Sequence, residues 1–104
     1  MFRKSKSWAP DLCLPEGNLA CINDIEENNF IHSIAKWSSV WLGGFDSGSE
    51  GYWEWTDGSQ VNFTNWATGR PHPLYTELDC LTIQYDGKWK DVICTRPKYY
   101  VCQS

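Results

Sequence analysis

The stretch from Gly69 to Cys80, GRPHPLYTELDC, gathers the residue types in this chain that are best suited to binding a ligand. Arg70 and His72 stand beside prolines, and the carboxylates Glu77 and Asp79 follow shortly before the cysteine. The stretch is therefore either a site that holds a ligand or the remnant of such a site.

Catalysis has little support in the remaining residues. A cysteine nucleophile needs a base, and the available combination is Cys21 with His32 or His72, in flanking sequence that matches no known nucleophile motif. A zinc hydrolase needs clustered ligands, whereas the two histidines lie on separate predicted elements. We therefore expect a protein that is not an enzyme, and we give the helical His32 no chemical role.

The cysteine count points to an oxidising compartment. Five cysteines in a chain of 104 residues predict two disulfides and one remaining thiol in a single secreted or extracellular domain, residues 1–104. The N-terminal MFRKSKSW lacks the apolar segment of a secretory signal, so we expect Met1 to begin a fragment of a longer precursor. The alternative, a cytosolic protein with unpaired thiols, fits the cysteine count less well.

The charge and hydropathy patterns exclude two classes of partner. The formal net charge is −4, and no long basic run is present, since Arg3, Lys4 and Lys6 alone make a weak patch. This distribution argues against nucleic acid as the partner. No apolar stretch approaches the length that a membrane-spanning helix requires, so we expect no membrane span in this chain.

Two helices are predicted. Ser7 can cap a first helix that runs to about Cys13. Asn23 and Glu26 have the spacing of a capping box, which predicts a second, amphipathic helix over residues 24–37. The apolar residues at helical spacing in this second segment are Phe30, Ile31, Ile34 and Trp37.

Short strands and one long loop make up the rest of the chain. Phe45 to Thr76 is dense in Gly, Ser, Asn, Asp and Pro, and a loop of this length in a small domain is usually functional. The predicted class is α+β, with two helices beside a small antiparallel sheet. The predicted strands are 39–44, 52–55, 78–85, 88–94 and 98–102.

The Asp-Gly pair at positions 86 and 87 is the strongest hairpin signal in the chain. With a two-residue turn, Cys80 lies nearly opposite Ile93, and Cys94 points to the other face of the sheet. A bridge between Cys80 and Cys94 then requires a bulge, or a second strand that ends near Asp91.

Six segments together resemble the C-type lectin-like domain. In chain order they are SWAPDLC, GNLACINDIEENNFI, VWLGG, YWEWTDGSQVNFTNW, LDCLTIQYDGKWKDVIC and YYVC. The resemblance implies disulfides Cys13–Cys102 and Cys80–Cys94 and leaves Cys21 as a buried, inert thiol. It also implies that the tryptophans around the long loop belong to the core rather than to a stacking surface; these are Trp41, Trp53, Trp55, Trp66 and Trp89.

The resemblance also implies a missing strand. Complete domains of this family begin with a strand that pairs with the last one, and this chain starts too late to contain it. We therefore expect the strand over 98–102 to have an open edge, or to be covered by Phe2 and the N-terminal residues. An open edge invites pairing between chains, so a homodimer through this edge is one expected partner.

Sugar-binding members of the family hold Ca²⁺ through a Glu-Pro-Asn or Gln-Pro-Asp triplet, a Glu before the loop cysteine and an Asn-Asp pair after the hairpin tryptophan. Here these positions read Arg70-Pro71-His72, Leu78 and Lys90-Asp91. Asp91 is the one family ligand that remains, with Glu77 and Asp79 nearby. Pro71 corresponds to a proline that is usually cis in the family.

Arg70 and Lys90 place positive charge where the family places ligands, and both repel a divalent cation at close range. A shift by one residue could return Glu77 to the site but would not remove these cations. We therefore expect the Ca²⁺ site to be lost, with no other cofactor.

A mixed-charge surface replaces it, formed by Arg70, His72, Tyr75, Lys90 and Asp91. Arginine and tyrosine are enriched in the energetic centres of protein interfaces, so this surface is the predicted ligand-binding site. The equally weighted alternative is that Arg70 or Lys90 pairs with Asp91 or Glu77 and closes the old site into structure.

The predicted function is recognition of a protein or glycan ligand by an extracellular, calcium-independent module. One alternative is a lectin with residual or calcium-dependent sugar binding. Another is a purely structural module of a larger protein. Asn62-Phe63-Thr64 is a glycosylation sequon, so we expect Asn62 to carry a glycan in a secreted protein.

Overall fold

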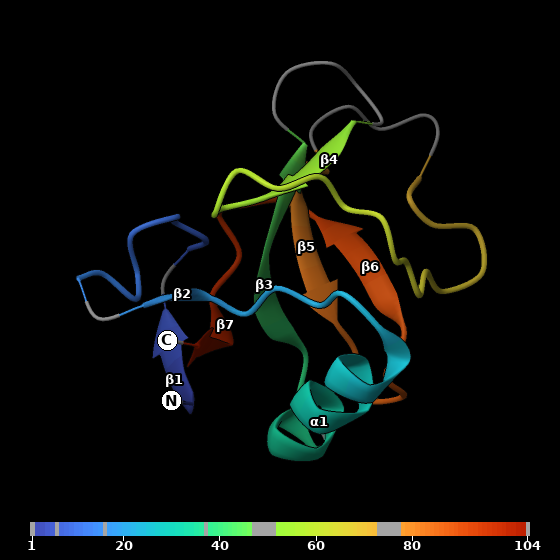
Figure 1. Cartoon of the computed structure of the whole chain (residues 1–104), viewed down its shortest axis with the longest axis horizontal. Coiled ribbons are helices and arrows are strands. Elements are labelled where there is room, and N and C mark those ends of the chain that lie inside the picture. Colours follow the sequence, from blue (N-terminus) through green and yellow to red (C-terminus); the bar gives the residue numbers. More distant parts are fainter. Residues whose placement is uncertain are drawn as a thin grey trace.

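A computed structural model describes residues 2–5, 7–15, 17–36, 38–46, 52–72 and 78–103 of the chain. Within these ranges it is an α+β fold in which one helix packs against a mixed sheet (Figure 1). The predicted site residue Tyr75, its neighbour Glu77 and the predicted helix residue Trp37 lie outside them.

The helix α1 spans Ile25–Ala35. Its N-cap is Asp24, whose side chain accepts a hydrogen bond from the Glu27 N–H at 2.8 Å, so the cap falls one residue later than predicted. Glu27 in turn accepts a bond from the Asn23 N–H at 2.8 Å, which satisfies a second N-terminal donor. No helix in the described part of the chain is long and apolar enough to cross a membrane.

The predicted first helix is wrong. Residues 10–15 form turns, in which the Leu12 and Leu14 N–H groups bond to the carbonyls of Ala9 and Asp11, three residues back. The segment lies between Pro10 and Pro15, and the second proline has no N–H to continue a helix. A stretch this short gains too few hydrogen bonds to offset helix nucleation.

In the part of the chain that the structure describes, seven strands form one mixed sheet in the order β1-β7-β3-β5-β6, with β2 also paired to β7 and β4 to β3 (Figure 1). The β3–β7 pair is parallel and the other pairs are antiparallel, so the sheet that was expected to be antiparallel is mixed at this one pair. The bounds are Phe2–Ser5 (β1), Asn18–Leu19 (β2), Val40–Asp46 (β3), Trp53–Trp55 (β4), Cys80–Ile83 (β5), Trp89–Val92 (β6) and Lys98–Gln103 (β7).

Strand β7 is covered on both sides. The N-terminal strand β1 pairs with it in an antiparallel register that sets Phe2 opposite Val101, and β3 occupies the other side. The expectation that the chain lacks this N-terminal strand is therefore wrong, and coverage by Phe2 and its neighbours is confirmed. Because β2 also pairs with the end of β7, the open edge that suggested a homodimer is absent from the described strands.

The β5–β6 hairpin has a three-residue loop, not the predicted two-residue turn. The Gln84 N–H bonds to the Lys88 carbonyl at 2.8 Å, and Gly87 adopts a positive φ of 83° in the loop. This loop sets Cys80 opposite Val92 instead of Ile93, so alternation places Cys94 on the same face as Cys80. The predicted bridge Cys80–Cys94 is confirmed, with the two Cα atoms 5.2 Å apart and β6 ending at Val92.

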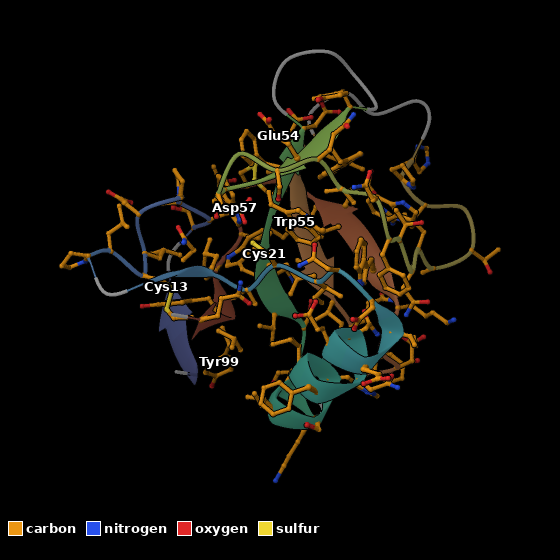
Figure 2. All side chains as sticks on the ribbon, viewed as in Figure 1. Cys13, Cys21, Glu54, Trp55, Asp57 and Tyr99 are labelled. Carbon is orange, nitrogen blue, oxygen red and sulfur yellow. A yellow bond between two sulfur atoms is a disulfide. The ribbon has the colours of Figure 1, made fainter. Side chains whose placement is uncertain are left out.

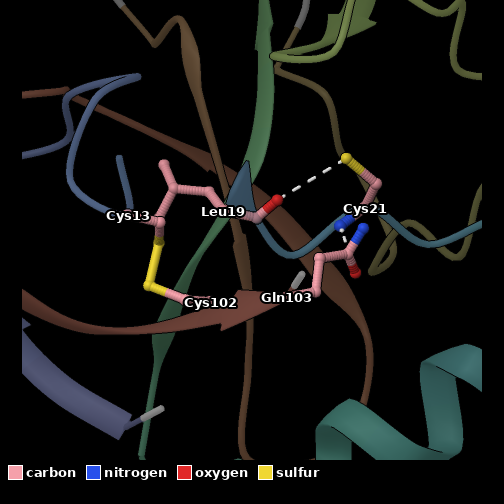
Figure 3. Close-up of a disulfide and its surroundings, with 5 residues drawn as sticks. All are labelled: Cys13, Leu19, Cys21, Cys102 and Gln103. Carbon is pink, nitrogen blue, oxygen red and sulfur yellow. Dashed lines mark hydrogen bonds between the residues drawn. A yellow bond between two sulfur atoms is a disulfide. The ribbon is translucent and has the colours of Figure 1, made fainter. Parts of the chain in front are cut away.

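The second disulfide, Cys13–Cys102, joins the N-terminal turns to β7 across 89 residues of sequence and is also confirmed (Figure 3). Cys21 is the free cysteine and is buried. Its thiol donates to the Leu19 carbonyl at 3.5 Å, and its N–H donates to the Gln103 side chain at 3.1 Å (Figure 3). Burial, with a smaller effect from Asp57, raises the pKa of the Cys21 thiol to about 12, so this thiol is inert.

Two apolar cores lie on the two faces of the sheet. The core toward α1 contains Leu42, Leu81 and Val101, and the opposite core contains Trp41 and Tyr100 from neighbouring strand positions. Trp41, Trp53, Trp55 and Trp89 are buried and Trp66 is half-buried, so their prediction as core residues is confirmed. Figure 2 shows the labelled Trp55 and Cys21 near the centre of the molecule.

Asn28 joins the helix to the hairpin. It is 1% exposed, and its side-chain amide donates to the Gly87 carbonyl at 3.0 Å and accepts from the Trp89 indole N–H at 2.6 Å. A buried amide is stable only when its donors and acceptors are paired, and both partners here belong to the hairpin. Asn28 therefore positions strand β6, which carries Asp91.

Candidate functional site

The long loop is anchored along β6 by backbone hydrogen bonds. The Trp89 N–H donates to the Asn65 carbonyl and the Ala67 N–H donates to the Trp89 carbonyl, each at 2.8 Å. The Arg70 N–H then closes a turn onto the Ala67 carbonyl at 3.0 Å. This path brings Arg70 beside Asp91, although 21 residues separate them in sequence.

Asp91 is the centre of the site. Its Oδ1 atom lies 3.1 Å from Arg70 Nη1, which also donates to the Asp91 backbone carbonyl at 3.1 Å. Its Oδ2 atom accepts from the His72 backbone N–H at 2.8 Å. The Asp91 side chain is 2% exposed and that of Arg70 23%, so this ion pair is largely removed from water.

Arg70 was expected either to bind a ligand as part of the mixed-charge surface or to form an ion pair with a nearby carboxylate. The structure contains the ion pair, with Asp91 as the partner. Both Asp91 carboxylate oxygens already accept hydrogen bonds, which leaves a carboxylate that is neutralised by a guanidinium. The Arg70–Pro71 peptide bond is cis, as the family resemblance implied. No group of three or more His, Cys, Asp or Glu residues in the described ranges is arranged to hold a metal ion.

Lys90 is separated from the ion pair by strand alternation. Asp91 and Trp89 share one face of β6, and Lys90 and Val92 share the other. Because β6 lies at the end of the strand order, residues from both of its faces line one groove of about 530 Å³. The structure thus brings Arg70, His72, Lys90 and Asp91 to one groove, with Tyr75 outside the described residues.

The groove continues over the sheet face away from α1, where it is lined by residues that sequence reasoning missed. Lys98 at the start of β7 donates from its ammonium to the Ser39 hydroxyl at 3.1 Å and lies 5.8 Å from the ring centroid of Trp41. Burial lowers the pKa of Lys98, and the neighbouring positive charges of Arg96 and Lys90 lower it further. The other missed lining residues are Gln84, Tyr85, Val92, Ile93 and Arg96.

A second, smaller hollow of about 280 Å³ lies beside Pro71. It is mostly apolar in residue type, and Thr64 is among its lining residues. The sequon residues Asn62 and Thr64 are exposed, so the sequon is accessible. The other lining residues are Tyr52, Trp53, Gln60, Val61 and Trp66.

Comparison with known proteins agrees with this architecture. The sequence profile of the Lectin C-type domain matches residues 4–104. The alpha-N-acetylgalactosamine-specific lectin of Patiria pectinifera is 39% identical over 99 residues, which cover 84% of this chain and 57% of that lectin. The chain thus spans little more than half of this relative.

Solved structures show the same fold. The human scavenger receptor C-type lectin carbohydrate-recognition domain superposes with a TM-score of 0.83 and 30% identity, covering 96% of this chain and 83% of that one. A calcium-independent type II antifreeze protein has a TM-score of 0.76 and 31% identity, covering 83% and 66%.

The relatives define the class of protein. The curated relatives are lectins and receptors, so this domain is not an enzyme, which confirms the sequence prediction. The profile match spans nearly the whole chain, and two solved relatives share its fold at 30% identity or more. The chain belongs to the C-type lectin domain family.

Proposed function

We propose that this chain is an extracellular recognition module that binds a glycan or protein ligand without calcium, through the long loop and the β6 strand. The binding residues are Arg70, His72, Lys90 and Asp91, with Tyr75 retained from the sequence prediction. The observation that carries calcium independence is the buried ion pair between Arg70 and Asp91, whose atoms lie 3.1 Å apart. Ligand binding is supported by the groove of about 530 Å³ that these residues line.

This ion pair argues against a Ca²⁺ ion at the family position. A divalent cation bound to Asp91 would lie close to the Arg70 guanidinium, and in this poorly solvated place the repulsion would be on the order of several kcal/mol. The ion would also have to displace two hydrogen-bond donors from the carboxylate. The residues present therefore do not fit Ca²⁺. The likeness to a protein named as a calcium-independent type II antifreeze protein supports such a state in this fold.

The names of relatives support a glycan as one of the two ligand classes. The relative from Patiria pectinifera is named for alpha-N-acetylgalactosamine, and a relative from Thalassophryne nattereri is named a galactose-specific lectin. Secretion is supported by the two disulfides, which persist in oxidising compartments. The exposed Asn62 supports glycosylation there.

A glycan array, run once with millimolar calcium and once with chelator, tests the proposal. We expect the same glycans to bind in both conditions. Loss of binding on chelation would overturn calcium independence and would favour the alternative of a calcium-dependent lectin.

Alanine variants test whether the groove binds the ligand at all. Lys90→Ala should weaken binding without changing the melting temperature, because Lys90 has no carboxylate partner in the described residues. Lys88→Ala is the matched control, since Lys88 lies on the same hairpin but contacts Asn65 and does not line the groove. Arg70→Ala is a poorer test, because it also leaves a buried carboxylate unpaired. Equal binding by the two lysine variants would place the ligand outside this groove, and no binding by the parent chain would favour a purely structural module.

A further inference from the structure

We infer that the groove on the sheet face away from α1 is an anion subsite, formed by Lys90, Arg96 and Lys98, and that the module's ligand is a sulfated saccharide. The inference deepens the proposed function, since it takes this groove as part of the same recognition surface. It concerns positive charges other than Arg70, which is already neutralised by Asp91.

The three cations come from separate segments that the fold brings together. Lys90 lies on β6, Lys98 begins β7, and Arg96 lies in the connection that crosses between these strands. Strand alternation sets Lys90 on the face of Val92, and Lys98 on the face of Tyr100. Both faces are the side of the sheet opposite α1, so the two lysines face one surface, and Arg96 lines the same groove.

These charges are not compensated locally. In the described residues, Asp91 is the only carboxylate that lines the groove, and it is occupied by Arg70. No carboxylate of those residues lies within ion-pair distance of Lys90, Arg96 or Lys98. An anion placed between them would gain attraction from all three cations without having to break an existing ion pair.

The position of Lys98 supports this view. Lys98 is half-buried, and its pKa is lowered first by burial and then by the charges of Arg96 and Lys90. Like charges held close together destabilise one another until a counter-charge is bound. The Ser39 hydroxyl takes one of the three ammonium donors of Lys98, so two donors are left for a ligand.

The rest of the lining favours a saccharide over other anions. The volume of about 530 Å³ suits a short oligosaccharide, and Ser39, Gln84 and Tyr85 offer a hydroxyl, an amide and an aromatic ring to sugar hydroxyls and faces. A sulfate ester placed among these three cations is attracted by all of them, and a saccharide can carry it into the groove. An extended polyanion such as nucleic acid is repelled by the net charge of −4.

Titration of the ¹⁵N-labelled chain by NMR tests the inference, with chelator present throughout. The probes are lactose 6′-sulfate, lactose, inorganic sulfate and a hexaglutamate peptide. We expect lactose 6′-sulfate to bind about tenfold or more tightly than lactose, with shifts at Arg96 and Lys98. Binding of the sulfated probe should weaken with added salt, whereas binding of lactose should not.

Variants locate the effect. Arg96→Gln and Lys90→Gln should each weaken binding of lactose 6′-sulfate by about threefold to tenfold, while Lys88→Gln changes it by less than about twofold. Arg96 is exposed and Lys90 is unpaired by any described carboxylate, so both variants should keep the near-ultraviolet circular dichroism of the parent. Equal losses in all three variants would overturn the inference.

The remaining outcomes separate this inference from the proposed function. Equal affinity for lactose and its sulfate overturns the anion subsite but leaves calcium-independent recognition standing. Binding of both sugars only when calcium is restored overturns the proposed function. Preference for hexaglutamate, with the same dependence on Lys90 and Arg96, would replace the saccharide by an acidic peptide. No binding of any anionic probe also overturns the subsite.

Discussion

Replacing Arg70 by methionine should destabilise the domain markedly. Methionine keeps most of the apolar stem but removes the guanidinium, which donates two hydrogen bonds of 3.1 Å to Asp91. Asp91, 2% exposed, would then keep, among the described residues, the backbone N–H of His72 as the donor to its carboxylate. A buried carboxylate that loses its counter-charge cannot be solvated, so the folded state loses free energy that the unfolded state does not.

The magnitude follows from the exposure of the pair. Removing one partner of a fully buried ion pair costs about 3–5 kcal/mol. Arg70 is 23% exposed, and water would take its place, so we expect a smaller loss of unfolding free energy, about 2–3 kcal/mol. For a domain of this size that corresponds to a fall in melting temperature of about 10–20 °C.

Urea denaturation followed by tryptophan fluorescence measures the free energy of unfolding. Arg96→Met is the matched control, because Arg96 is exposed, and it should change stability by less than about 0.5 kcal/mol. A double-mutant cycle with Asp91→Asn should give a coupling energy of about 1 kcal/mol or more. A loss below about 0.5 kcal/mol for Arg70→Met, or no coupling, would refute the view that this ion pair holds the loop to β6.

Four further predictions follow from other parts of the molecule. Asn28→Ala should cost about 2–4 kcal/mol in urea denaturation, because the Trp89 indole N–H and a hairpin carbonyl lose their buried partner; an unchanged midpoint would contradict this. Gly44→Ala should lower the free energy of unfolding by about 1–3 kcal/mol, because a Cβ there would lie 2.5 Å from Leu81 Cδ2 in a filled core. An unchanged free energy of unfolding would mean that the neighbouring side chains can move to make room. The Cys21 thiol has a pKa of about 12, so its alkylation rate in the native state should still rise about tenfold per pH unit above pH 9, where the rate of an unfolded thiol becomes constant. Because the pKa is higher in the folded than in the unfolded state, the free energy of unfolding should also fall as the pH rises from about 9 toward 12. The melting temperature should be the same in millimolar calcium and in chelator, since a cation that binds the native state would raise it.

Local patterns predicted the elements that depend on nearby residues. The alternation around the Asp-Gly pair located the β5–β6 hairpin, and the acidic first turn with its apolar spacing located α1. The prediction of the hairpin turn was wrong because two local backbone conformations differ little in energy. A three-residue loop and a two-residue turn both suit an Asp-Gly pair, yet the choice moved the partner of Cys80 by one position. The helix predicted near residues 10–15 is absent there because the segment is too short to nucleate a helix.

The candidate site was predictable in part. The juxtaposition of Arg70 and Asp91 followed from the family resemblance, and the structure contains the ion pair that was one of two alternatives. The basic groove was not predictable, because it depends on the parallel pairing of β3 with β7, in which Trp41 lies opposite Tyr100. No local pattern specifies a pairing between segments so far apart in sequence. Without that pairing, nothing places Lys98 near Lys90.

The pairing of β1 with β7 also sets where the two ends of the chain lie relative to the groove. Phe2 lies opposite Val101, so both ends of the chain leave from the same margin of the sheet, and Figure 1 marks N and C side by side there. The strand order puts β6, with Asp91 and Lys90, at the opposite margin. Lys98, at the other end of the groove, lies opposite Ser5 of β1. A tether at either end would therefore leave the β6 side of the recognition surface facing outward.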